Sequence, residues 1–221
     1  MGSVALRFPD ASTVEKIFPS FSEGGGDVGS MVRGLLSEHS LKAKDIGVVA
    51  VGIGPGSYTG TRVALTFAKV FAYTLGVPLY GRCGLEVLAF EHGSDQSPVS
   101  VAMPGHQGRL YAARYDAREV PLSVLTPLGL YDAATWWGTC TCDDSLILHA
   151  DLVSQRPTNA SGPIHLIDRV SAASLCAYTE ALMNKGCPPV DGWTLEPLYL
   201  QLSAPERAAL GSTAQKEERS P

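Results

Sequence analysis

The sequence of 221 residues predicts an α/β protein, and two observations carry this prediction. Residues 46–53, IGVVAVGI, form an almost unbroken apolar run rich in β-branched residues, which is typical of a strand covered on both faces. The glycine-rich loop GPGSYTG follows this run, and residues 61–75 then have the pattern of a long apolar helix that ends at Gly76. Strand, loop and helix in this order indicate an α/β unit.

The flanking segments extend the pattern in both directions. Residues 3–8 and 14–20 are expected to form the two strands of a hairpin. Residues 28–36 carry apolar side chains at helical spacing, and Asp27 is the expected N-cap of that helix. After the long apolar helix, VPLYG predicts a short strand and GLEVLAFEHG a further helix.

A polar stretch, SDQSP at residues 94–98, is the best candidate for a boundary between two subdomains. Beyond it, VSVAM and RLYAARYD are expected to pair antiparallel around the turn PGHQG, and SLILHA to form a buried strand. Ser171 is the expected cap of a last helix. We therefore predict an N-terminal subdomain at 1–97, a C-terminal subdomain at 98–210 and a disordered polar tail at 211–221.

Charge and composition restrict the function classes. The formal net charge of −5 argues against a principal nucleic-acid binder, because such proteins usually present a basic face. No apolar run reaches the roughly 18 residues that span a bilayer, and the N-terminus lacks the pattern of a secretory signal. A cytoplasmic protein without membrane contact is therefore expected.

The cysteines predict neither disulfides nor a metal site. They are odd in number and unevenly spaced: Cys83, Cys140, Cys142, Cys176 and Cys187. Cys140 and Cys142 form a C-x-C pair that His149 could extend, but tetrahedral zinc usually needs four ligands. Reduced thiols are the expected state.

The glycine loop fails the tests for three known kinds of site. A Walker loop needs lysine after its last glycine, but Thr61 and Arg62 follow Gly60. A dinucleotide fingerprint needs a later acid, and no acid lies between Asp45 and Glu86. The G-x-S-x-G elbow of hydrolases is not present around Ser57.

Two interpretations of this loop stay open. The loop is either a structural turn in which Ser57 or Thr59 caps the following helix, or also an anion site. The candidate anion-binding residues are Gly56, Ser57, Thr59, Gly60 and Arg62.

The helix after the loop is apolar almost all round, which requires cover on two faces. Only Thr66, Lys69, Tyr73 and Thr74 form a narrow polar stripe. A sheet can cover one face, and a second domain or another subunit the other; the alternative is a central helix wholly inside this chain. Residues 46–85 contain no acid and carry a local charge of +3, which would complement an acidic partner surface or a bound phosphate.

These residues also carry a family resemblance. The block GIGPGSYTGTRVALTFAKVFAYTLGVPLYGRCGLEVLA resembles the signature region of the TsaB family of tRNA threonylcarbamoyladenosine biosynthesis proteins, which reads close to GPGSFTGLRIGLATAKGLA…IPL.G.SSLE.LA. The ending LEPLYLQLSAPER is similar to the family's closing P.YLR, with Gln201 where arginine is usual. The resemblance implies a fold like the actin, Hsp70 and sugar-kinase ATPases, with two ribonuclease-H-like subdomains whose mixed sheets are flanked by helices.

The resemblance further implies a non-catalytic accessory subunit. It would bind and activate a TsaD-type transferase, with a TsaE-type ATPase as a third component, and meet tRNA only through that complex. It implies no cofactor of its own, because the partner subunits use ATP and Mg²⁺. Contact with TsaD, or homodimer formation, is expected through the first two helices, with the interface residues Val28, Met31, Val32, Leu35, Val63, Phe67, Val70 and Phe71.

The chain departs from the family pattern in several places. Family members usually open with a strand such as ILAIDTS before the segment that matches SVALRF, and the resemblance implies that this strand is absent or that the start is misplaced. Its loss weakens a role in nucleotide binding. The usual D.R.GEVY segment is PGHQGRLY here, with Pro104 and Arg109 in place of acids, and FSEGGG keeps Ser22 and Glu23 without the usual histidine.

Three rival functions remain beside the accessory subunit. One is a stand-alone homodimer that binds a nucleotide or another anion. Another is an ATPase or kinase in its own right, which would need acids at its Mg²⁺ and phosphate loops, and the resemblance implies that the first such loop is missing. The third is a metallopeptidase, which would need paired ligands such as H-E-x-x-H, whereas the five histidines are scattered singly.

Overall fold

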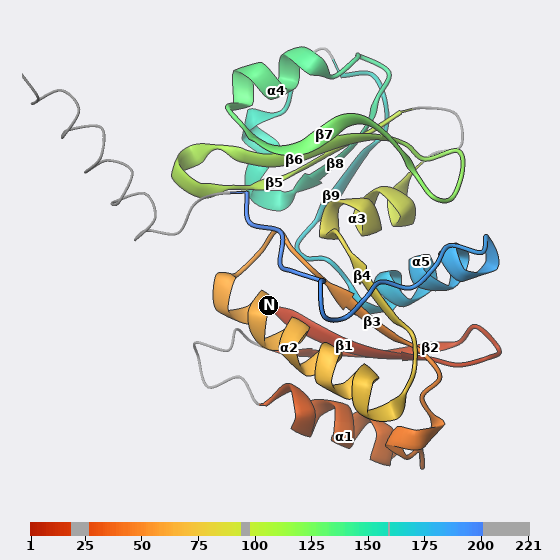
Figure 1. The fold of residues 1–221 in the computed structure, drawn as a ribbon. Helices are drawn as coiled ribbons and strands as arrows, with labels where there is room; N and C mark the ends of the chain where they lie inside the picture. The colour runs from red at the N-terminus through yellow and green to blue at the C-terminus, as the bar shows by residue number, and fades with distance from the viewer. Residues whose placement is uncertain (19–26, 94–97, 159, 201–221) are drawn as a thin grey trace, which may run out of the picture.

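The computed structural model describes residues 1–18, 27–93, 98–158 and 160–200, which form two α/β halves with helices between and outside them (Figure 1). The predicted fold class, α/β with mixed sheets flanked by helices, is confirmed. Where the chain is described, no helix is long and apolar enough to cross a membrane.

Two separate two-stranded sheets form the strand layer of the N-terminal half. The strands are β1 (Gly2–Arg7), β2 (Thr13–Phe18), β3 (Val49–Gly52) and β4 (Leu79–Arg82). β1 and β2 form the predicted antiparallel hairpin, whereas β3 and β4 pair in parallel because α2 crosses between them. The helices of this half are α1 (Val28–Glu38), the short η2 (Ala43–Asp45) and α2 (Tyr58–Leu75).

One five-stranded sheet forms the C-terminal half, in the order β7-β6-β5-β8-β9. The strands are β5 (Val99–Pro104), β6 (Leu110–Asp116), β7 (Ser123–Tyr131), β8 (Ser145–His149) and β9 (Ile164–Ile167). β5 is the central strand, antiparallel to β6 and parallel to β8. The helices are α4 (Ala133–Thr139) and the short η3 (His106–Gly108) and η4 (Ala150–Gln155).

Two helices cross from one half to the other. α3 (Gly84–His92) follows β4 but packs on β5, β6 and β8 of the C-terminal sheet. α5 (Ala172–Asn184) follows β9 but packs on β1, β2 and β3. The two helices contact each other and form a layer between the sheets (Figure 1). Each half is therefore covered by a helix that follows, along the chain, the last strand of the other half.

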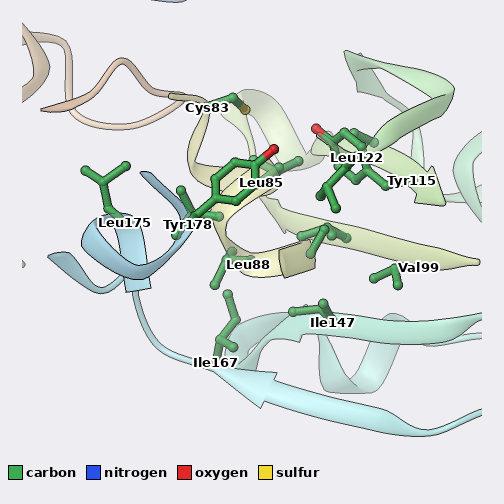
Figure 2. Close-up of a cluster of buried hydrophobic side chains, with 14 of the residues drawn as sticks. Cys83, Leu85, Leu88, Val99, Tyr115, Leu122, Ile147, Ile167, Leu175 and Tyr178 are labelled. Atoms are coloured by element: carbon green, nitrogen blue, oxygen red, sulfur yellow. The ribbon is translucent and has the colours of Figure 1, made fainter. Parts of the chain in front are cut away.

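The main core lies around this helix layer and the C-terminal sheet (Figure 2). Leu85 and Leu88 of α3, Val99 of β5, Ile147 of β8 and Tyr178 of α5 are completely buried. Figure 2 shows Tyr178 beside Leu85, with Val99 and Ile147 farther along the sheet. Burial of these large side chains removes apolar surface from water and couples the two halves.

Most of the predicted elements are present, with corrections at their ends. The predicted strand at 46–53 pairs only over Val49–Gly52, because β4, its partner among the described strands, is four residues long. The long apolar helix begins at Tyr58, three residues before its predicted start at Thr61. β7, α4 and β9 were not predicted.

Some predictions remain untested. The subdomain division at 97/98 stays a prediction, although α5 lies against the N-terminal strands rather than with the half that precedes it. The tail at 211–221, Gln201 and the Ser22–Glu23 pair lie outside the described residues.

Candidate functional site

The α2 helix has two apolar faces, as its sequence predicted. One face holds Leu65, Ala68 and Ala72, which are buried against the β3–β4 pair. Another exposes Val63 and Val70, whose relative exposures are 39% and 60%. Within the described part of the chain, α2 is therefore not the wholly internal helix that was the alternative interpretation.

The α1 helix lies beside α2. Asp27 caps its N-terminus as predicted, because the Asp27 Oδ1 accepts a hydrogen bond from the Gly29 N–H at 3.1 Å. Val28 and Leu35, two of the predicted interface residues, are buried within the chain at 7% and 2% exposure. Met31 and Val32 are half-buried. The structure thus places Val28 and Leu35 inside the chain rather than on an exposed face of α1.

A groove of about 640 Å³ runs between α1 and α2. Phe67 and Phe71 line it and stack on each other, with ring centroids 5.3 Å apart and planes inclined by 18°. A Cβ at Gly29 would lie 3.3 Å from the Phe67 ring, so the absence of a side chain allows α1 to approach this aromatic closely. We call the exposed α2 side chains and this groove together the α1–α2 surface.

Val32, another predicted interface residue, also lines the groove, whereas the rest of the lining was not among the predicted residues. It comes from Gly29, Arg33, Leu36, Ser37, Ser40, Leu41, Lys42 and Ala43. Arg33 and Lys42 give this surface a basic contribution. Sequence periodicity missed Leu41, Lys42 and Ala43 because they lie after the end of α1, where helical spacing no longer applies.

The glycine loop turns the chain from β3 into α2, and the structure assigns the cap of α2 to Ser57 rather than Thr59. Ser57 Oγ accepts a hydrogen bond from the Gly60 N–H at 3.3 Å. Gly54 has a φ of +108°, which a residue with a side chain rarely adopts. Its carbonyl accepts a bond from the Gly84 N–H at 2.9 Å, so the loop is tied to the start of α3.

Arg62, the only cation among the candidate anion-binding residues, is held by two tyrosines. Its guanidinium lies 4.0 Å from the centroid of the Tyr58 ring and 5.3 Å from that of Tyr199, and its Nε donates a hydrogen bond to the Tyr199 hydroxyl. This bond is the main cause that raises the pKa of Arg62 above its ordinary value. The cation–π and hydrogen-bond contacts hold the guanidinium against the closing segment of the chain.

That closing segment passes over the glycine loop. The Leu198 N–H donates to the Ile53 carbonyl at 2.8 Å, and the Tyr58 and Tyr199 rings lie 5.3 Å apart. No sequence pattern indicated this contact, because 137 positions separate Arg62 from Tyr199. The predicted anion-binding residues lie together in one loop and the first turn of α2: Gly56, Ser57, Thr59, Gly60 and Arg62. The cation among them, Arg62, already contacts Tyr58 and Tyr199.

The described residues contain no group of three or more His, Cys, Asp or Glu side chains that could hold a metal ion. Cys140 and Cys142 do not form such a group with His149. The five cysteines, all of which the structure describes, are free thiols, as predicted.

Comparisons with known proteins point to one group of relatives. The family described as "TsaD: tRNA N6-adenosine threonylcarbamoyltransferase" matches residues 27–124. The tRNA threonylcarbamoyladenosine biosynthesis protein TsaB of Bacillus subtilis is 30% identical over 96 residues, which are 43% of this chain and 42% of that protein. The protein of the same description from Escherichia coli is 30% identical over 93 residues, 40% of this chain and 39% of its own length.

A longer match extends over 173 residues of an uncharacterized Mycobacterium leprae protein at 27% identity, covering 71% of this chain and 47% of that protein. The matched regions therefore span less than half the length of these relatives.

A solved structure supports the fold. YeaZ from Pseudomonas aeruginosa superimposes with a TM-score of 0.71 at 19% identity, over 90% of this chain and 93% of that one. The likeness shows that the two chains share a fold, in agreement with the predicted α/β class with mixed sheets flanked by helices. In its signature block, its relatives and its fold, this chain is similar to the TsaB proteins.

Proposed function

We propose that this chain is a non-catalytic accessory subunit in the biosynthesis of threonylcarbamoyladenosine in tRNA, and that it binds a TsaD-type transferase through the α1–α2 surface. The observation that carries the proposal is the exposed apolar face of α2 beside the aromatic groove. The TsaB relatives supply the pathway.

The α1–α2 surface has the character of a protein interface. Val70 and Tyr73 are 60% and 73% exposed on α2, and Val63 continues the same helix toward its N-terminus. Phe67 and Phe71 lie next to them in a groove that a partner side chain can enter. Aromatic side chains in a concave apolar surface are frequent anchors of protein interfaces, and arginine near them adds specificity.

The relationship to the TsaD family favours that partner. The matched residues 27–124 include both α1 and α2, so a TsaD-type protein is expected to carry a counterpart of this helix pair. Two related helix pairs can pack across a pseudo-twofold axis, as identical surfaces do in a symmetric dimer. A homodimer of this chain would use the same surface and would compete with the transferase.

The contacts within the glycine loop are also consistent with the accessory role. Ser57 caps α2 and Arg62 is held by Tyr58 and Tyr199, so these groups stabilise the loop and the closing segment. We propose that the loop sets the position of α2, and that the ATP and Mg²⁺ of the reaction are bound by the partner subunits, including a TsaE-type ATPase.

The test is the Val70→Asp variant, mixed with a TsaD-type transferase and followed by light-scattering chromatography and by threonylcarbamoyl transfer to tRNA. A charge at this exposed position must be desolvated in the complex, so complex formation is expected to fall at least about 100-fold. Phe71→Asp is a poorer choice, because Phe71 also packs against the core around Leu65.

Val124→Asp is the matched control, since Val124 is 58% exposed but lies on β7 in the other half. This variant should bind and support transfer like the parent. A Val70→Asp protein that still forms the complex would overturn the proposed surface. A parent chain that remains a homodimer and never binds the transferase would overturn the accessory function itself.

A further inference from the structure

Trp193 lies on the closing segment, residues 190–200, next to the end of α2. Its side chain is 78% exposed, whereas Trp136 is completely buried and Trp137 is half-buried. The Trp193 ring contacts the exposed ring of Tyr73 on α2, with centroids 5.5 Å apart and planes inclined by 70°. This edge-to-face contact is a favoured arrangement of two aromatic rings. We call the two rings the Tyr73–Trp193 pair.

The backbone beneath Trp193 is fixed, although its side chain is exposed. The Asp191 carbonyl accepts a hydrogen bond from the Leu195 N–H at 3.0 Å, and the Asp191 Oδ1 accepts one from the Trp193 N–H at 3.0 Å. The Val190 N–H joins this turn to β4, because it donates to the Leu79 carbonyl at 2.9 Å. Leu195 packs against the core that α2 shares with β3 and β4. The indole of Trp193 is therefore carried by an ordered turn.

The closing segment runs along α2 and extends the α1–α2 surface. Its Tyr199 contacts Tyr58 at the start of α2, and its Trp193 contacts Tyr73 near the end. In Figure 1 this segment, drawn in blue, returns from α5 past β4 toward the glycine loop. Tyr73 lies three residues after Val70, and side chains at this spacing are neighbours on a helix. A partner that covers Val70 therefore meets the Tyr73–Trp193 pair as well.

The two rings add substantially to the area that a partner can cover. Tyr73 and Trp193 are 73% and 78% exposed in the chain. An aromatic side chain contributes about 150–250 Å² when it is buried, and a stable interface takes about 800 Å² from each partner. Covering both rings would therefore supply roughly a third of the required area.

The chemistry around the pair favours a protein pocket over a nucleic acid. The Trp193 indole N–H has no acceptor within the described part of the chain, so a partner can supply one. Exposed rings also stack on bases, but proteins that bind single-stranded nucleic acid combine such rings with a positively charged groove. Here Lys69 lies one helical turn before Tyr73, whereas the closing segment carries two exposed acids, Asp191 and Glu196. Charges of both signs do not form such a groove.

The extent of the family match favours the transferase over a second copy of this chain. The match to the TsaD family covers residues 27–124, which include α1 and α2 but not the closing segment. The helix pair is therefore expected in both partners, whereas the segment with Trp193 lies outside the matched region. In a complex with the transferase, Trp193 faces a different surface, which can carry a pocket for it. A symmetric dimer instead buries the same surface of both copies.

We propose that the Tyr73–Trp193 pair is a second anchor for the TsaD-type transferase, and that the Trp193 indole enters an apolar pocket of the transferase that contains a hydrogen-bond acceptor. This inference rests on the proposed function, because it adds a further part to the same interface. Tryptophan and tyrosine are frequent hot spots of interfaces. A ring on an ordered turn also loses little conformational freedom on binding, which favours affinity.

Fluorine NMR can follow Trp193 in the parent chain. 5-Fluorotryptophan is incorporated into this chain alone, whose three tryptophans then give the only fluorine signals, and the signal lost in Trp193→Phe is that of Trp193. The signal of an exposed fluoroindole shifts between H₂O and D₂O. With saturating unlabelled transferase, this isotope shift of Trp193 is expected to fall at least about three-fold, because interface anchors are shielded from water. The signal of Trp136, which is already buried, should not change.

Titration of the transferase measures the contribution of the pair to affinity. Trp193→Ala should weaken the complex at least about ten-fold, and Tyr73→Ala should also weaken it. The double variant should lose less than the two losses combined, because the rings contact each other. Leu166→Ala is the matched control and should bind like the parent, since Leu166 is 57% exposed but lies on β9 in the other half. Trp193→Ala should leave the thermal unfolding of the free chain unchanged, because the ring is exposed.

The outcomes separate this inference from the proposed function. A complex in which Trp193 keeps its isotope shift, or parent affinity in Trp193→Ala, would overturn the second anchor. If Val70→Asp still disrupts that complex, the proposed function stands without it. A Trp193 shift that is lost as the concentration of the chain alone rises, or with tRNA alone, would also overturn the inference and assign the pair to a second copy or to RNA. A parent chain that never binds the transferase would overturn both proposals.

Discussion

In the C-terminal half, β5 runs through the middle of a five-stranded sheet, and Val99, Val101 and Ala102 are completely inaccessible to solvent. In the N-terminal half, a cavity of about 790 Å³ lies between β1 and β3, and all six residues of β1 are only half-buried. The two halves share a hairpin and a parallel pair, yet among the described residues only the C-terminal half joins them in a single sheet.

This difference shows where each half obtains its stability. An isolated two-stranded sheet is marginal in water, so β1–β2 and β3–β4 depend on the helices that pack on them. The C-terminal sheet instead supplies the core itself, together with α3 and α5.

One carboxylate in each half, Asp144 and Glu15, shows the same difference between internal stabilisation and dependence on the other half. Asp144 is completely buried and accepts from Arg114 Nε and Nη2, both at 2.7 Å, and from Ser100 Oγ at 2.6 Å. Glu15 on β2 is half-buried and accepts from the Ala172 N–H at 2.8 Å at the start of α5. The first carboxylate stabilises a half internally, and the second ties a hairpin to a helix of the other half.

The largest expected effect comes from removing Arg114. An Arg114→Met variant leaves the Asp144 carboxylate buried without its cation, which typically costs about 3–5 kcal/mol of unfolding free energy. Urea unfolding at neutral pH measures this loss. Arg118→Met is the control, because its exposed pair with Asp116 should contribute little. A loss for Arg114→Met no larger than the control would contradict the view that this half is stabilised from within.

A smaller loss of unfolding free energy should distinguish the packing of the two halves. Leu88→Ala in α3 removes a completely buried side chain and should cost about 3 kcal/mol. Val4→Ala in β1 removes a half-buried side chain beside the cavity between β1 and β3 and should cost less than about 1 kcal/mol. Both values come from urea unfolding. Equal losses at the two positions would mean that the N-terminal strands are packed as tightly as the C-terminal core.

The smallest expected effect concerns acid. Burial raises the pKa of Asp144, but hydrogen bonds from Arg114 and Ser100 outweigh burial and hold this pKa below its ordinary value. Burial also raises the pKa of Glu15, and hydrogen bonds from Ser3 and from the Ala172 N–H outweigh it, so this pKa is lowered as well. A carboxyl whose pKa is lower in the folded state stabilises the fold above its unfolded pKa, about 3.9 for aspartate.

This stabilisation is lost as the pH falls from about 4 through the folded-state pKa values. The unfolding free energy should therefore drop in that range, with a shallower slope in Asp144→Asn and in Glu15→Gln than in the parent chain. Thermal unfolding between neutral pH and roughly pH 3 measures these slopes. Identical slopes in the parent and in both variants would show that neither carboxylate is coupled to folding.

Local sequence signals predicted much of the fold. Asp27 and Ser171 were predicted as helix caps, and both accept the expected backbone hydrogen bonds. The run at 46–53 was recognised as a covered strand because β-branched residues without polar alternation fit no exposed position. β7 was missed because it is an edge strand with exposed residues at its start and a proline at position 127. α4 was missed because seven residues are too few to show a helical period.

The candidate site was predictable only in part. The apolar character of α2 indicated a second covered face, and Val63 and Val70 are indeed exposed on it. Whether Val28 and Leu35 face outward depends on how α1 is rotated, which the spacing of apolar residues along one helix does not determine. The partners of Arg62 could not be predicted, because Tyr199 approaches it only after the whole chain has folded.

Residue patterns within single segments were enough to predict the α/β class, the caps, the strand–loop–helix region around GPGSYTG and the family resemblance. Other features became visible only in the folded chain: α3 and α5 exchange halves, Tyr58 and Tyr199 hold Arg62, and a cavity separates β1 from β3. Those features are contacts between segments far apart in the chain. Their free energy comes from burial and hydrogen bonding across space, which no local pattern records.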